Sequence, residues 1–109
     1  MMSTLLLIAA LQTVVSGTAQ PVAADASDNV GVNGIFYELD GQPIGEELFS
    51  PPVQNVSSAI SWDTTTLPNG IYTITVFARD EAGNEGSASV VVDVQNADTE
   101  PPTVVIIQP

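Results

Sequence analysis

The sequence predicts an all-β fold, a sandwich of about seven antiparallel strands with Greek-key connections. Segments in which apolar and polar residues alternate recur about every 10 residues, and clusters of Gly, Pro, Asn and Asp separate them. No helical period of comparable length interrupts this pattern. A length of 109 residues fits one such domain.

The N-terminal segment, residues 1–12, has two interpretations. Residues 4–8, TLLLI, match residues 103–107, TVVII, in pattern, which favours a first strand. The alternative is a secretory signal segment that ends at the small residues 17–19. Residues 1–19 contain no Lys or Arg, and this weakens the signal interpretation. Under either interpretation we expect the chain to lie outside the cytoplasm.

Residues 13–96 form the predicted sandwich domain. Its first part, residues 14–26, ends at the turn residues 27–29, and Asp40-Gly41 predicts a tight reversal because this pair accepts positive φ. Later strands show the period of two that half-buried strands require. The residues expected on their inward faces are Ile35, Tyr37 and Leu39; Ser58, Ile60 and Trp62; Tyr72, Ile74, Val76 and Ala78; Ala88, Val90, Val92 and Val94.

Residues 67–72, LPNGIY, indicate an immunoglobulin-like sandwich rather than a barrel. A Tyr just after the corner into the penultimate strand is typical of the tyrosine corner, whose hydroxyl bonds to backbone a few residues upstream. With this corner, the chain resembles the bacterial Ig-like module over about residues 15–94. The motifs that carry the resemblance are ASDNVGV at 26–32, YELDG at 37–41, SWDTTTLPNG at 61–70 and ARDEAGN at 78–84. The resemblance implies a module that occurs in tandem in secreted enzymes and surface adhesins.

Residues 97–109 predict an acidic linker and the start of a following module. The pair Pro101-Pro102 should hold the linker extended. Residues 104–107, VVII, have the composition of a strand, and an unpaired apolar strand is an aggregation hazard unless another domain covers it. We therefore expect neighbouring modules of a longer chain as partners.

The composition restricts the function. Thirteen acidic residues and one basic residue give a net charge of −12, which disfavours nucleic acid and anionic membrane surfaces as partners. No apolar run approaches the length that crosses a bilayer, so we expect no membrane insertion. The chain contains no Cys and no His, so a thiol nucleophile and the commonest general base are missing. The sequence predicts a monomeric, non-enzymatic domain in an extracellular or cell-surface protein.

Asp28, Asp80 and Asn84 are candidate Ca²⁺ ligands. The two loops that hold them should meet at one pole of the sandwich, and Ca²⁺ binds about six to eight oxygen ligands. Alternatively, the two aspartates bond their own backbones in Asx turns. Asp98 and Glu100 would contribute only with a following module attached.

Aromatic residues bear on the choice between a spacer and a binding module. Trp62 alternates with Ile60, so we expect it in the core rather than on a sugar-binding surface. Phe36, Phe49 and Phe77 are expected on outward or loop positions, and they are scattered in the sequence. The sequence therefore predicts a spacer or accessory module of a larger bacterial surface or secreted protein. The alternative is a module that binds carbohydrate or a host or cell-surface protein and is attached to a secreted hydrolase. An exposed aromatic pair on one sheet face would favour this alternative.

Overall fold

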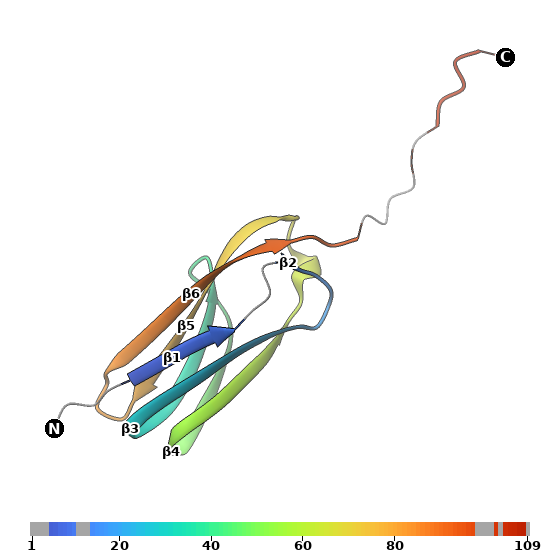
Figure 1. Ribbon diagram of the computed structural model, residues 1–109. Coiled ribbons are helices and arrows are strands. Elements are labelled where there is room, and N and C mark those ends of the chain that lie inside the picture. Colours follow the sequence, from blue (N-terminus) through green and yellow to red (C-terminus); the bar gives the residue numbers. More distant parts are fainter. Residues whose placement is uncertain (1–4, 11–13, 98–101, 103, 109) are drawn as a thin grey trace.

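The computed structural model describes residues 5–10, 14–97, 102 and 104–108, with only the backbone of residues 5–10 (Figure 1). None of the described residues belongs to a helix long and apolar enough to span a membrane. The elements in chain order are β1 (Leu5–Ala10), β2 (Val14–Val15), β3 (Gln20–Leu39), β4 (Gln42–Trp62), the 3-10 helix η1 (Thr64–Thr66), β5 (Gly70–Asp80) and β6 (Glu85–Val94).

The strands form two layers because β3 and β4 each run through both of them. In the first layer, residues 20–27 of β3 lie between β1 and residues 55–62 of β4, antiparallel to each. In the second layer, residues 34–39 of β3 lie between residues 42–48 of β4 and residues 74–79 of β5. β6 pairs with β5, and β2 adds to β6 at the edge. The predicted β-sandwich is confirmed.

Two details differ from the expected strand pattern. The described residues form six strands, because β3 continues through residues 28–31, where a turn was expected, and β4 is continuous through residues 50–54. Shifts in the β3–β4 register fall between Ser27 and Val32 and again before Gly34, and such irregularities bend a strand without ending it. The β2–β6 pair is also parallel, whereas all pairs were expected to be antiparallel.

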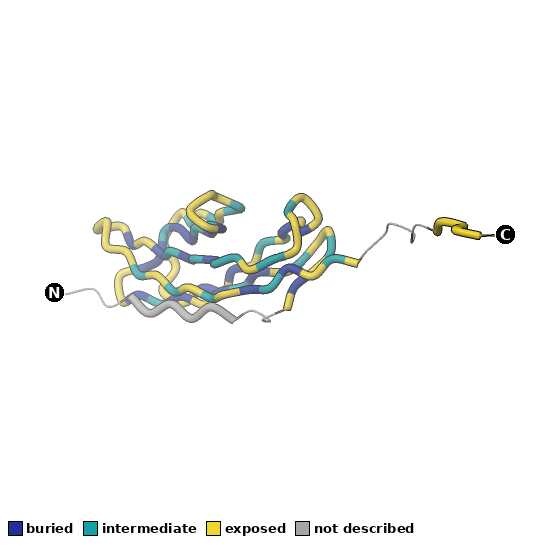
Figure 2. Tube along the Cα trace, turned by 90° about the horizontal axis from the view of Figure 1, so that it is seen from above, coloured by how far each residue is buried: buried dark blue, intermediate teal, exposed yellow. Residues whose placement is uncertain are grey.

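The core lies between the two layers and consists mainly of valine, isoleucine and alanine side chains. Figure 2 shows buried and exposed positions alternating along the strands, as the period of two requires. Most of the expected inward residues are buried, and Ile60, Tyr72 and Val90 pack against the core while partly exposed. The period of two therefore identified the inward faces of these strands.

Trp62 ends β4 inside this core, with 5% of its surface exposed. Its expected inward orientation is confirmed. Because it is the only Trp of the chain, native fluorescence should be blue-shifted and weakly quenched by iodide. Unfolding in urea should shift the emission to the red and expose the ring to the quencher. Emission typical of a hydrated indole in the native protein would contradict this burial.

The tyrosine corner is also confirmed. The Tyr72 hydroxyl donates a hydrogen bond to the Pro68 carbonyl oxygen, four residues upstream, at 2.7 Å. This bond is accessible to water, so Tyr72→Phe should lower the free energy of unfolding by only about 1 kcal/mol. Urea denaturation of both proteins measures the difference. An unchanged midpoint would mean that water replaces the bond without loss.

Candidate functional site

Two phenylalanines lie side by side on the outer face of the second layer. Phe36 of β3 and Phe77 of β5 are register partners in the antiparallel pair. The neighbours of Phe36, Ile35 and Tyr37, are fully buried, so Phe36 points outward by the alternation of the strand. Both phenylalanines are partly exposed, and they form an aromatic pair on one sheet face.

The expectation that all three phenylalanines lie on outward or loop positions was wrong for Phe49. Phe36 and Phe77 are far apart in the sequence, and only the strand register makes them neighbours. Phe49 packs against the core, because Leu48 takes the outward position on β4 and Phe49 follows it on the inner face. The sequence assigned Phe36 and Phe77 to outward positions, but it did not show that their strands lie opposite each other.

A hollow of about 370 Å³ opens over this aromatic pair, and we call it the aromatic hollow. Besides the two rings, its lining includes four charged side chains. They are Glu38, Glu46, Arg79 and Glu85. The hollow therefore has an aromatic floor and three carboxylates around it.

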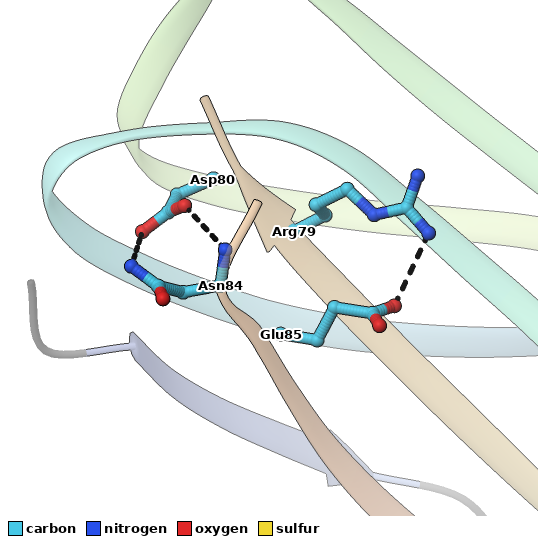
Figure 3. Close-up of polar contacts among 4 residues, drawn as sticks. All are labelled: Arg79, Asp80, Asn84 and Glu85. Atoms are coloured by element: carbon cyan, nitrogen blue, oxygen red, sulfur yellow. Dashed lines mark hydrogen bonds and ion pairs between the residues drawn. The ribbon is translucent and has the colours of Figure 1, made fainter. Parts of the chain in front are cut away.

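Arg79 is the only Lys or Arg of the chain. Its guanidinium lies 5.0 Å from the centroid of the Phe36 ring, in cation–π range. Its Nη2 atom also lies 3.2 Å from Oε2 of Glu85, and both side chains are about half exposed (Figure 3). Among the described residues, no ion pair involves Glu38 or Glu46. The charge of the aromatic hollow is therefore negative.

The β5–β6 turn is held by Asp80 and Asn84. The buried Asp80 carboxylate accepts hydrogen bonds from the Asn84 backbone amide at 2.9 Å and from its side-chain amide at 3.1 Å (Figure 3). At the β3 bend, Oδ2 of the buried Asp28 accepts bonds from the amides of Val30 and Gly31 at 3.1 and 2.9 Å. Asp28 thus accepts from the amide two residues downstream, as in an Asx turn, whereas Asp80 accepts from the amide four residues downstream.

The structure brings two of the three candidate Ca²⁺ ligands, Asp80 and Asn84, into direct contact. The Asp28 carboxylate accepts a hydrogen bond from the Gly31 amide at the β3 bend. In the described part of the chain, no group of three or more acidic, His or Cys side chains is arranged to hold a metal ion. Asp98 and Glu100 lie outside the described residues. The calcium site stays a prediction.

A polar cluster around Asn96 fixes the point where the chain leaves β6. The Asn96 side chain donates to the Thr64 carbonyl oxygen at 3.0 Å and accepts from the Gly17 amide at 3.1 Å and the Thr64 hydroxyl at 2.8 Å. Its backbone amide donates to Oδ1 of Asn69 at 2.9 Å. We call these four residues the Asn96 clamp. Sequence reasoning missed it because its members come from four separate segments, with no motif in common.

Comparisons with known proteins agree with this fold. A family model described as a bacterial Ig domain matches residues 9–76, more than half of the chain. A search of curated proteins found no match. Among solved structures, the fibronectin(III)-like modules of Clostridium thermocellum CbhA give a TM-score of 0.64 at 24% identity, covering 95% of this chain and 52% of that chain. CopC from Methylosinus trichosporium OB3b gives a TM-score of 0.48 at 14% identity, covering 92% of this chain and 100% of that chain. The chain thus spans about half the length of the CbhA structure, and this likeness shows a shared fold.

Proposed function

Because the chain belongs to the bacterial Ig domain family, we propose that it is a non-catalytic, extracellular spacer or accessory module of a larger multidomain protein. The observation that carries this proposal is the course of the chain, which enters and leaves the sandwich at opposite poles. The absence of His and Cys from the sequence supports a non-catalytic role.

The two poles are defined by the strand register. Leu5, at the start of β1, lies opposite Asp28 at the β3 bend, and the end of β5 at Asp80 pairs with Val32 just after that bend. The Asn96 clamp lies at the other pole, where β5 begins (Figure 1). β5 has 11 residues, so the sandwich is about 35 Å long. Copies joined in series would each add this length.

The C-terminal segment supports a following module. Val104, Val105, Ile106 and Ile107 are 73–90% exposed, which is a hazard for an isolated domain. The sequence 103–107 repeats the pattern of residues 4–8, of which residues 5–8 belong to β1. We propose that this segment supplies the β1 strand of the next module.

A two-module chain tests the spacer role. Residues 1–102 are joined to residues 4–109, so that TLLLI takes the place of TVVII. The exposed Ala82 is replaced by Cys in both copies for spin labels, which is straightforward because the chain contains no Cys. Pulsed electron–electron double resonance measures the distance between the two labels. We expect one narrow distribution centred at about 50 Å, which is the length of one sandwich plus that of an extended linker. A broad distribution would contradict a spacer of fixed length.

The Asn96 clamp provides a matched pair of variants in the same two-module chain. Asn96→Ala removes the side-chain bonds to Thr64 and Gly17, so the distance distribution should widen. Gln95→Ala is the control, because the Gln95 side chain bonds only to Asp93 in the described structure, and it should leave the distribution unchanged. Equal widths in both variants would show that the clamp does not set the direction of the linker.

A second candidate function is that of a binding module for a polysaccharide or a cell-surface protein. The aromatic hollow favours it, because binding sites combine aromatic side chains with a few charged groups in a concave surface. If this function is correct, Phe77→Leu should weaken binding of the polysaccharide or protein ligand. The distance distribution of the two-module chain should stay the same.

A further inference from the structure

We propose that the aromatic hollow receives a cationic side chain, a Lys or Arg, presented by an exposed basic segment of a partner protein. This inference rests on the second proposed function, the binding module, and gives the chemical class of its ligand. It is independent of the spacer role.

The floor of the hollow already holds one cation. The Arg79 guanidinium lies 5.0 Å from the Phe36 centroid, so the structure contains an intramolecular example of the proposed contact. Phe77, the register partner of Phe36, offers a second ring in the same hollow. The electron-rich face of such a ring attracts Lys and Arg side chains.

The charges around the hollow favour a cation over other ligands. Three carboxylates line it against a single guanidinium, and that guanidinium is paired with Glu85. Glu38 and Glu46 therefore leave an excess of negative charge beside the rings. The net charge of −12 adds a long-range field that attracts basic segments and repels anionic polymers. A neutral sugar would gain from the rings but nothing from this excess charge.

Nuclear magnetic resonance titration with a defined probe tests the inference. The probe is the capped hexapeptide Gly-Arg-Gly-Gly-Arg-Gly, and the control peptide carries citrulline, a neutral isostere, in place of both arginines. At low ionic strength, we expect the arginine peptide to shift signals of Phe36, Phe77 and their strand neighbours. The citrulline peptide should not shift them, and added salt should weaken the binding of the arginine peptide.

Matched variants separate the hollow from general attraction to an acidic surface. Phe77→Leu keeps an apolar side chain but removes the ring, and binding should weaken about threefold. Glu46→Gln and Glu81→Gln change the net charge equally, and both glutamates are exposed, but only Glu46 lines the hollow. Binding should weaken about threefold in Glu46→Gln and remain nearly unchanged in Glu81→Gln. Because these two changes are on the surface, they test the site even if Phe77→Leu perturbs folding.

Three results would overturn the inference. Shifts spread over the whole surface, with equal losses in Glu46→Gln and Glu81→Gln, would show unspecific attraction. Binding of soluble hydroxyethyl cellulose that Phe77→Leu abolishes, without peptide binding, would keep the binding-module function and replace the cationic ligand by a carbohydrate. Absence of binding to either probe would remove the binding-module function and leave the spacer role, which the distance measurement tests separately.

Discussion

Gly31→Ala is expected to lower the free energy of unfolding by about 2–4 kcal/mol. Gly31 has a φ of +135° at the β3 bend, a conformation that side chains disfavour. An added Cβ would also lie 2.6 Å from Cβ of Pro52 on β4. Strain and overlap therefore act together at the point where β3 passes from one layer to the other. Urea denaturation, followed through Trp62 fluorescence, measures the loss.

Two other glycines separate these causes. Gly17 and Gly83 also have positive φ, +96° and +86°, but no atom lies within 4 Å of an added Cβ. Gly17→Ala and Gly83→Ala should therefore lose about 1 kcal/mol each, from backbone strain alone. A similar loss in all three variants would show that β4 yields at Pro52 and that close contact contributes nothing.

Tyr37→Phe is expected to lower the free energy of unfolding by about 2 kcal/mol. The Tyr37 side chain is fully buried, and its hydroxyl donates to Oγ of Ser58 at 2.6 Å. Ser58 lies in the other layer and donates in turn to Oε1 of Glu47 at 2.8 Å. The variant breaks one of the two hydrogen bonds by which Ser58 joins the layers, and it leaves the buried Ser58 hydroxyl with one partner fewer. A loss no larger than that of Tyr72→Phe would contradict this account.

The same residue should affect stability at alkaline pH. Burial raises the pKa of Tyr37 above its ordinary value near 10, with a further contribution from the charge of Glu47, while the bond to Ser58 lowers it. A pKa that is higher in the folded than in the unfolded state favours folding below the unfolded pKa, and this contribution is lost as pH rises through the folded pKa. Stability should therefore fall above about pH 10 in the wild type. Tyr37→Phe should show a shallower fall, and parallel curves would contradict the assignment.

The two proposals use different parts of the molecule. The spacer role depends on the poles, where Leu5 enters and the Asn96 clamp holds the exit. The binding role depends on the outer face of the second layer, around Phe36 and Phe77. A module in a series can therefore carry out both, because neighbours joined at the poles leave that sheet face uncovered.

The sequence by itself determined the all-β class, the inward faces of most strands and the corner at residues 67–72. These features depend on residues that are close in the chain. Alternation at a period of two decides which side of a strand is buried, as for Ile74 and Trp62. The Tyr72 hydroxyl donates to the Pro68 carbonyl oxygen, only four residues away, so a short motif is enough to predict this hydrogen bond.

The tertiary structure decided the features that join distant segments. The register of β3 against β5 places Phe36 beside Phe77, and the sequence of neither strand fixes that register. β3 and β4 continue through both layers with a shift in register at the bend, where Gly31 lies close to Pro52 of the neighbouring strand. The Asn96 clamp likewise gathers residues from separate segments. Local patterns show which face of each strand is buried, but the partners of a side chain follow from packing between segments far apart in the chain.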